Sequence, residues 1–371
     1  MLRKSRRYLF SLLAVLAIAF LLYKFRSAMS LQGFRWGLVG ASLEQANLPL
    51  LALALVAIYV CYAIRALRWV RFCRGLGTAH FGNVYSATLM GFTCVFLLGR
   101  AGEPVRPILI ARKDSLSMPR MFGIFVLERV FDMGATALLA IVALLLFERH
   151  RLPGTANDIV MESARSAGVV LLGGLIAAIS FLVYFRYHGA SWLASRLELG
   201  GWRHGWRSKV VLLLQGFSEG LQSIRTWGDL ASLSTYTIAH WVLVVLVYYW
   251  TTHAFSGSLA ALDLSSIMLL LAFTLVGSAA QLPVAGGGSQ AASFLVLTLI
   301  FGVEKELAAV ASIVMWLVAF AGCSLVGLPL LLREGWSMGE LRRIAREEQK
   351  AEEVHLFADA EHGAAPGERL Q

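Results

Sequence analysis

The stretch that decides the fold is Leu97–Asp132, LLGRAGEPVRPILIARKDSLSMPRMFGIFVLERVFD. Glycines and prolines interrupt any helix in its first part, and charged side chains stand among apolar runs throughout. Six of these charged residues are candidate substrate-binding residues: Arg100, Glu103, Arg106, Glu128, Arg129 and Asp132. Inside a membrane, each Asp, Lys or Arg costs at least ~2.5–3.5 kcal/mol. Such side chains need an internal partner, a water-filled cavity or a substrate, so the stretch predicts a membrane substrate site.

The composition is that of a membrane protein. Of the 371 residues, 58% are hydrophobic and 15% are charged, whereas a soluble domain is about 25% charged. We therefore predict an all-α polytopic membrane protein. The net charge of +10 is interpreted as loop charge that sets membrane orientation, so no nucleic-acid partner is expected. The four cysteines lack metal-site spacing and are expected to be core or lipid-facing residues, with no metal or cofactor bound.

Apolar runs bounded by basic residues predict about six full spans. These are Tyr8–Tyr23, Leu48–Ala63, Met121–Phe147, Gly168–Phe185, Ser234–Thr252 and Leu307–Leu332. Four arginines spaced three apart follow the second span: Arg65, Arg68, Arg71 and Arg74. We interpret them as marking its return to the cytoplasmic face, with Trp69 at the membrane interface. The basic residues at both ends of the chain predict that the N-terminus and the C-terminus are cytoplasmic.

Two further segments complete the predicted topology. Lys209–Arg225 carries apolar residues at helical spacing on one side only, which predicts a helix lying on the cytoplasmic leaflet. Residues 336–371 have the composition of a charged cytoplasmic tail, helical at first and then disordered. The chain is therefore divided into a transmembrane domain, residues 1–335, and this tail.

Two segments are apolar but interrupted by glycine or proline: His80–Lys113 and Ile267–Phe301. Counting the spans on either side predicts that both are re-entrant hairpins, the first opening to the cytoplasm and the second to the outside. Oppositely oriented broken helices are typical of an inverted-topology repeat, in which they meet near the midplane to form a transport site. The alternative is two ordinary kinked hairpins whose glycines allow close packing.

Glu128 and Asp132 are four residues apart and share one helix face. Arg100 and Arg106 of the first broken segment are their expected partners. One alternative is that these ion pairs only tie the hairpin to the helix. The other is that one guanidinium remains to bind an anionic lipid head group, with Glu103 and Asp132 available for a cationic or hydroxylated one.

The second broken segment supplies six more candidate substrate-binding residues: Gln281, Pro283, Gly286, Gly287, Gly288 and Gln290. Three consecutive glycines let the backbone approach a ligand closely, and the N–H groups at the following helix start favour an anion. Two histidines, His240 and His253, stand alone on an apolar helix and are interpreted as packing or interface residues.

Three motifs carry a family resemblance: GRAGEPVRPILIARK (Gly99–Lys113), ERVFD (Glu128–Asp132) and QLPVAGGGSQAA (Gln281–Ala292). Over about residues 5 to 335 the chain resembles the flippase-like family built on the lysylphosphatidylglycerol synthase transmembrane region. Gln290 departs from the pattern, because a glutamate is usual near it. The resemblance implies lipid translocation in a bacterial inner membrane. The soluble synthase domain of that family is not expected here, so synthesis of an aminoacyl lipid is not expected either.

The first functional hypothesis is a flippase that moves a polar or lipid-linked substrate between leaflets, with no catalytic residue. The expected partners are a membrane lipid or lipid-linked sugar as substrate, and anionic lipid at the cytoplasmic face. One alternative is a membrane transferase that acts on a polyprenyl-phosphate or phospholipid donor. Another is a non-catalytic membrane subunit for a neighbouring enzyme of lipid or glycan biosynthesis.

Overall fold

A computed structural model describes residues 35–150, 223–224, 226–278, 281–282 and 286–335, together with four single positions between 169 and 180. Some predicted elements lie wholly or largely outside these residues: the spans Tyr8–Tyr23 and Gly168–Phe185, the helix Lys209–Arg225 and the tail 336–371.

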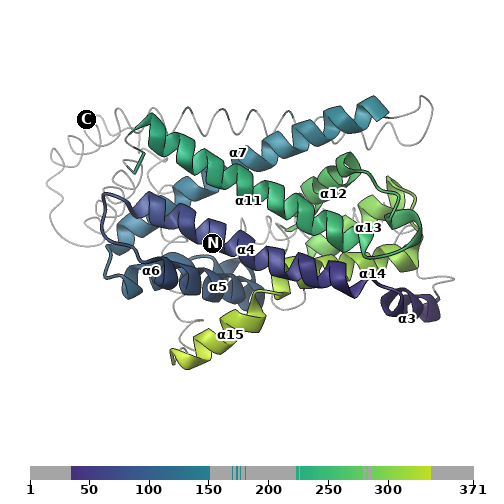
Figure 1. Cartoon of the computed structure of the whole chain (residues 1–371), viewed down its shortest axis with the longest axis horizontal. Coiled ribbons are helices and arrows are strands. Elements are labelled where there is room, and N and C mark those ends of the chain that lie inside the picture. The colour runs from purple at the N-terminus through teal and green to yellow at the C-terminus, as the bar shows by residue number, and fades with distance from the viewer. Residues whose placement is uncertain are drawn as a thin grey trace, which may run out of the picture.

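The described residues are almost entirely helical, as expected for an all-α membrane protein (Figure 1). In chain order the elements are α3 (Trp36–Glu44), α4 (Leu48–Cys73), α5 (Phe81–Leu98), the 3₁₀ turn η1 (Gly99–Gly102), α6 (Val105–Lys113), α7 (Met118–His150), α11 (Trp227–His253), η3 (Gly257–Leu259), α12 (Leu264–Gly277), the two-residue strands β1 (Gln281–Leu282) and β2 (Gly286–Gly287), α13 (Gly288–Leu299), α14 (Lys305–Trp316), the π-helical turn η5 (Leu317–Ala321) and α15 (Ser324–Arg333). The sequence did not predict α3.

Five stretches of the described residues are long and apolar enough to cross a membrane: Leu48–Cys73, Phe81–Gly102, Met118–Leu146, Trp227–His253 and Lys305–Arg333. Four of them coincide with predicted full spans. The fifth, Phe81–Gly102, is the first arm of the predicted broken segment. It is longer than expected, because α5 and η1 follow each other without a loop.

Helices α4 and α11 lie side by side in opposite directions and form the frame of the bundle (Figure 1). At one end, the backbone N–H of Asn47 donates to the carbonyl of Ala254 at 2.7 Å. At the other end, Arg71 pairs with Asp229 at 2.8 Å. A capping box between Thr226 and Asp229 starts α11 at this place. These two ends are called the Asn47 end and the Asp229 end below.

The first broken segment forms a hairpin of α5, η1 and α6, which is called the first hairpin. Its two feet lie together, because Asp114 after α6 accepts a hydrogen bond of 3.1 Å from the backbone N–H of His80 before α5. They lie at the Asp229 end, where α4 ends at Cys73 and the chain passes on to α5. The turn η1 packs directly on α5, where a Cβ on Gly102 would collide with the backbone of Cys94. Only glycine permits this return of the chain along α5.

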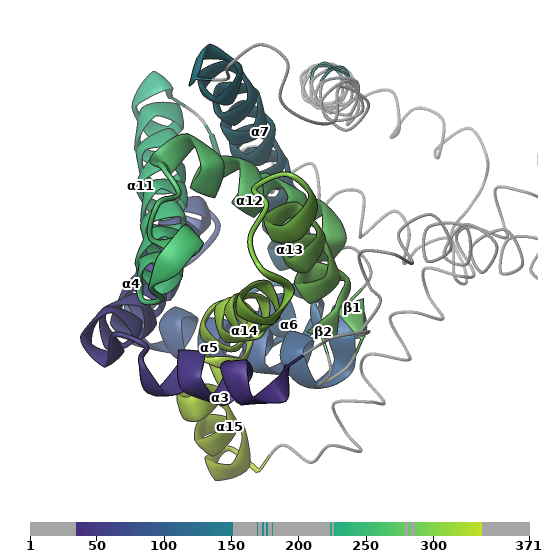
Figure 2. The ribbon, with the colours of Figure 1, turned by 90° about the vertical axis from the view of Figure 1, so that its right-hand side faces the viewer.

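The second broken segment forms a hairpin of α12, β1, β2 and α13, which is called the second hairpin and starts from the Asn47 end (Figure 2). In its turn, Gln281 pairs with Gly287 and Leu282 with Gly286 in antiparallel register. Across its arms, the Thr274 and Ser293 hydroxyl groups are 2.8 Å apart.

The two hairpins come from opposite ends of the bundle (Figure 1). Their turns are in contact with each other. Arg100 in η1 donates from Nη2 to the carbonyl oxygen of Ser278, just after α12, at 3.3 Å. Strand β1 also contacts η1. The turns of two segments nearly 180 residues apart in the chain therefore touch each other.

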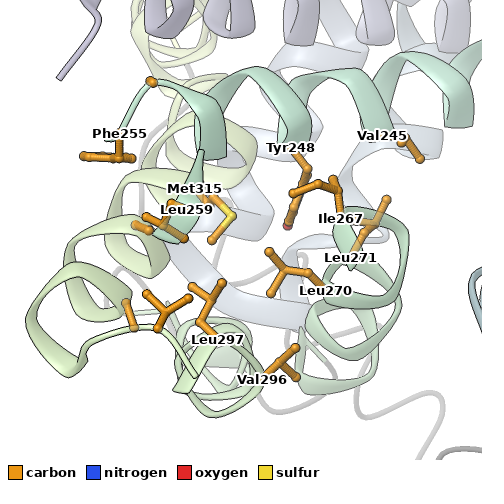
Figure 3. Packing of buried hydrophobic residues seen from close by; sticks show 14 of the residues in the cluster. Val245, Tyr248, Phe255, Leu259, Ile267, Leu270, Leu271, Val296, Leu297 and Met315 are labelled. Atoms are coloured by element: carbon orange, nitrogen blue, oxygen red, sulfur yellow. The ribbon is translucent and has the colours of Figure 1, made fainter. Parts of the chain in front are cut away.

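An apolar core surrounds the second hairpin (Figure 3). Tyr248 of α11, Leu270 of α12, Leu297 of α13 and Met315 of α14 point into it and are almost fully buried. Because these side chains come from four helices, their packing holds the second hairpin against α11 and α14.

The predicted span Leu307–Leu332 is interrupted at its centre. Between α14 and α15 the chain forms one π-helical turn, which frees carbonyl groups from the helical hydrogen-bond ladder. The Tyr59 hydroxyl donates to the carbonyl of Gly322 at 2.6 Å, and the Tyr62 hydroxyl donates to that of Ala319 at 3.4 Å. Two tyrosines of α4 therefore supply hydrogen-bond donors to carbonyl groups at the interruption of this helix.

Substituting Gly277 by alanine should destabilise the protein by about 1–3 kcal/mol, the usual cost of overpacking. A Cβ at Gly277 would collide with the carbonyl oxygen of Gly288 and with Ala292, and would force the arms of the second hairpin apart. The measurement is the free energy of unfolding in mixed micelles. Gly40→Ala on α3 is the matched control, since its Cβ would meet nothing within 4 Å. Equal stability of the two variants would contradict the close packing of α12 and α13.

Candidate functional site: a buried ionic cluster

A group of charged side chains from three helices, with one histidine from a fourth, gathers inside the bundle and is called the ionic cluster. Its members are Arg65 and Arg68 of α4, Arg106 of α6, Glu128, Arg129 and Asp132 of α7, and His240 of α11. His240 lies 13 residues, or about 20 Å, from either end of α11. The cluster is therefore deep along the long axis of the bundle.

Glu128 is at the centre of the ionic cluster and is fully buried. Its Oε1 accepts hydrogen bonds from Arg65 Nε at 3.0 Å and from Arg68 Nη2 at 2.8 Å. Arg106 binds both carboxylate oxygens of Glu128. A bidentate guanidinium–carboxylate pair is the strongest arrangement for such groups, and it fastens the first hairpin to α7.

Asp132 lies one helical turn further along α7 and faces the same side as Glu128. Its Oδ1 accepts a hydrogen bond of 2.8 Å from Arg68, and its Oδ2 accepts one from Arg65. Arg129 completes the group, 3.4 Å from Asp132 and 3.6 Å from Glu128. Its side chain is 36% exposed, which makes Arg129 the outermost member of the ionic cluster.

Helix α11 contributes two neutral groups. The Thr237 hydroxyl accepts a hydrogen bond from Arg68 at 2.9 Å, and His240 Nε2 lies 3.3 Å from Arg65 Nη1. Because a guanidinium can only donate, His240 Nε2 is the acceptor and the ring proton is on Nδ1. The sequence-based interpretation of His240 as a packing residue is therefore wrong. His253 instead stacks on Tyr249, as expected for a packing residue.

Aromatic rings enclose the guanidinium groups. The Arg106 guanidinium carbon lies 5.0 Å from the centre of the Trp69 ring and 5.3 Å from that of Phe92. Phe125 contacts both Arg106 and Arg129. Trp69 is fully buried, so its prediction as an interface residue is wrong. Cation–π contacts of this kind offset part of the cost of burying charge.

Among the described residues, the ionic cluster contains more positive than negative charge. Four guanidinium groups surround two carboxylates, which leaves a formal excess of two positive charges with His240 neutral. Buried charges are normally paired, because desolvation costs several kcal/mol per ion. The described part of the ionic cluster is therefore short of anions.

Four of the six charged residues predicted from Leu97–Asp132 lie in the ionic cluster, namely Arg106, Glu128, Arg129 and Asp132. The expected pairing of Arg106 with the α7 carboxylates is confirmed. That of Arg100 is wrong, since Arg100 is 52% exposed and pairs with Glu103 at 3.1 Å within the turn of the first hairpin. The two residues are only three positions apart, so their side chains meet locally without reaching across to α7.

The candidates from the second hairpin form its turn, and Pro283 lies outside the described residues. Gln281 and Gly286 belong to the two short strands. Gly287 has a φ of 104°, which an L side chain rarely adopts, and its N–H donates to Gln290 Oε1. Gly288 begins α13 at the close contact with Gly277. This turn contacts the turn of the first hairpin at Arg100. The ionic cluster instead takes its member of the first hairpin, Arg106, from α6.

Arg65, Arg68 and His240 are site residues that the sequence did not predict. The predicted second span ends at Ala63, but α4 continues to Cys73 and buries both arginines. One signal was available: Trp69, Val70, Phe72 and Cys73 continue the apolar pattern between the arginines, which is typical of a helix that is still inside the protein.

Two observations concern metal and thiol chemistry. In the part of the chain that the structure describes, no three His, Cys, Asp or Glu side chains are close enough to hold a metal ion together. The four cysteines are free and buried in the core, as predicted.

Comparison with known proteins gives one match. A family model described as Lysylphosphatidylglycerol synthase TM region matches residues 9–327. No curated protein and no solved structure matches the chain.

Proposed function

The chain belongs to the family of lysylphosphatidylglycerol synthase transmembrane regions, and from this premise we propose that it translocates a polar lipid or lipid-linked group between the leaflets of the cytoplasmic membrane. The observation that carries the proposal is the ionic cluster, a set of charges deep inside an apolar helical bundle. Intramembrane ionisable residues are expensive, and they commonly mark the path of a polar substrate.

The arrangement of the hairpins supports a transport architecture. One unit consists of α4, the first hairpin and α7, and the other of α11, the second hairpin and α14 with α15. Helix α4 runs from the Asn47 end to the Asp229 end, and α11 runs in the reverse direction. We interpret the units as an inverted-topology repeat, with six full spans and two oppositely oriented re-entrant hairpins.

In this proposal the Asp229 end and both chain termini face the cytoplasm. The head group of the lipid passes the ionic cluster, while its acyl chains stay beside the apolar outer faces of the helices. Leu138 and Leu145 of α7, both about 60% exposed, are examples of such lipid-facing residues. The ionic cluster replaces part of the water that the head group leaves behind, which lowers the barrier to crossing.

Asp132→Asn should reduce lipid translocation at least about tenfold. The ionic cluster would lose one of its two carboxylates, and Arg65 would lose one of its two charged partners. The measurement uses liposomes with the purified full-length protein and a fluorescent phospholipid, whose outer-leaflet fraction is bleached by a membrane-impermeant reductant. Glu334→Gln is the control, since Glu334 pairs with Lys113 at the Asp229 end, away from the ionic cluster.

Two results would contradict the proposal. One is translocation by wild-type liposomes no faster than in protein-free liposomes. The other is equal rates for Asp132→Asn and wild type. Thin-layer analysis of the same lipids separates transport from chemistry, because a transferase would convert the lipid to a new product and a translocator would return it unchanged.

A further inference from the structure

We propose that the π-helical turn η5 is a hinge within one span, so that α14 moves with the second hairpin and α15 moves with the first. The role of this hinge in transport rests on the proposed function, whereas its movement can be measured without transport. Three observations support the inference: the packing of α14, the packing of α15 and the hydrogen bonds at η5 itself.

Helix α14 is fixed to the second unit. Its residues Ala311 and Met315 are buried in the same apolar core as Leu297 of α13. The sulfur atom of Met315 also lies 4.0 Å from the hydroxyl oxygen of Thr252 on α11. Because α11 and α13 both belong to the second unit, a movement of that unit carries α14 with it.

Helix α15 is fixed to the first hairpin, although it directly follows α14 in the chain. A Cβ on Gly327 would collide with the carbonyl oxygen of Leu89 and with the Thr93 hydroxyl, both on α5. At the end of α15, Glu334 pairs with Lys113 at a foot of the first hairpin. The backbone of α15 therefore lies directly against α5, and a movement of the first hairpin carries α15 with it.

Helix α7 of the first unit makes the corresponding exchange. Near its start it packs with α6 of its own hairpin, where Met121 and Ile124 share an apolar cluster with Leu109. Further along it packs against α12 of the second hairpin, where Leu139 shares an apolar cluster with Leu270. The last span of each unit therefore begins on its own hairpin and ends on the other. A movement of one hairpin against the other has to bend such a span.

The turn η5 lies where α14 and α15 part. In Figure 2 α14 is seen almost end-on, whereas α15 slopes away below it. The Tyr59 hydroxyl donates to the carbonyl of Gly322 at 2.6 Å, and the Tyr62 hydroxyl donates to that of Ala319 at 3.4 Å. Single π-helical turns occur frequently at functional sites. Since both donors are side chains of another helix, these bonds can break and form again without unfolding α14 or α15.

The experiment measures distances between two spin labels by pulsed electron paramagnetic resonance, on the full-length protein in nanodiscs of phosphatidylethanolamine and phosphatidylglycerol. The four native cysteines are buried and are replaced by alanine. The hinge pair has labels at positions 313 on α14 and 332 on α15, where the native side chains are more than half exposed. The reference pair, at positions 56 and 67, lies within the continuous helix α4. We expect two distances for the hinge pair and one narrow distance for the reference pair.

A third pair tests which unit α15 follows. Labels at positions 81 and 332 join the start of α5 to the end of α15, and both native side chains are exposed. We expect one distance for this pair, because α15 moves with the first hairpin. Two distances would mean that α15 moves against α5 and would overturn the proposal.

Tyr59→Phe tests the hydrogen bond at the hinge. It should raise the population of the second distance of the hinge pair about two- to tenfold, because the bond to Gly322 is made only in the state shown here. Tyr85→Phe is the matched control, since the Tyr85 hydroxyl donates to the carbonyl of Tyr59, within the first unit, and this population should stay unchanged. Tyr62→Phe takes the place of Tyr59→Phe if that variant does not fold.

One narrow distance for the hinge pair, both in the labelled protein and in Tyr59→Phe, would overturn the proposal. An equal rise in Tyr85→Phe would also overturn it. Failure of this inference is distinguishable from failure of the proposed function. Two distances without lipid translocation in liposomes would support the hinge and contradict transport. Translocation by a protein whose hinge pair keeps one narrow distance would contradict the hinge alone.

Discussion

Replacing Glu128 by glutamine should lower the free energy of unfolding by about 3–5 kcal/mol, the cost of removing one partner from a buried ion pair. Glu128 is fully buried and accepts hydrogen bonds from Arg65, Arg68 and Arg106. In the variant, four guanidinium groups would face a single carboxylate. The measurement is equilibrium unfolding in mixed micelles of neutral and denaturing detergent, followed by circular dichroism.

Glu103→Gln provides the control for Glu128→Gln. Glu103 is the glutamate of the first motif, and its ion pair with the half-exposed Arg100 is local. Exposed pairs contribute at most about 1 kcal/mol, so this variant should remain close to wild type. Similar losses in the two variants would mean that Glu128 is not the centre of a buried cluster.

A comparison with Arg106→Gln tests the excess of positive charge separately. Removing Arg106 lowers that excess, whereas removing Glu128 raises it, although each breaks the same bidentate pair. We therefore expect Arg106→Gln to destabilise the protein less than Glu128→Gln, and the double variant to recover part of the loss. Equal losses in the two single variants would point to further acceptors for Arg106 and would contradict an excess of positive charge in the ionic cluster.

The sequence was sufficient for the parts of the fold that depend on local signals. Interrupted apolar runs located both hairpins, because glycine and proline act on the backbone wherever they stand. The i, i+4 spacing of Glu128 and Asp132 identified a shared face, and the structure places the two carboxylates in contact with the same arginines. These inferences did not depend on which helices pack against α7 or against the hairpins.

Arg65 and Arg68 illustrate what the sequence alone did not decide. Arginines three residues apart after an apolar run are typical of a cytoplasmic boundary, and equally of one buried helix face. The difference lies in Glu128, Asp132 and Thr237, which are 60 or more residues away and reach α4 only through tertiary packing. His240 was missed for the same reason, since its partner Arg65 is 175 residues distant.

The π-helical turn between α14 and α15 had no clear local signal either. No proline stands at Leu317–Ala321, and Pro329 lies further along in α15. The turn is stable because Tyr59 and Tyr62 of α4 satisfy the carbonyl groups that it frees. A side chain from another helix therefore determines where this span is interrupted.

Cross-linking the turns of the two hairpins should abolish lipid translocation. The turns touch where Arg100 donates to the carbonyl of Ser278. In transporters built from inverted repeats, access to the site alternates when one half moves against the other. Cysteines at positions 100 and 278, joined by a cleavable bifunctional reagent with a flexible spacer, would fix the two hairpins to each other. The four native cysteines are buried, and the variant used for labelling replaces them with alanine.

We expect transport in the cross-linked protein to fall to the rate of protein-free liposomes and to return when the spacer is cleaved. Its control joins cysteines at positions 80 and 114, the two feet of the first hairpin, which belong to one unit and are already held by a hydrogen bond. A link inside one unit does not restrict its movement against the other, so it should leave transport intact. Full activity with the hairpin turns linked would mean that they stay together during transport. The exposed side of the ionic cluster, at Arg129, would then have to serve both leaflets without relative movement of the two units.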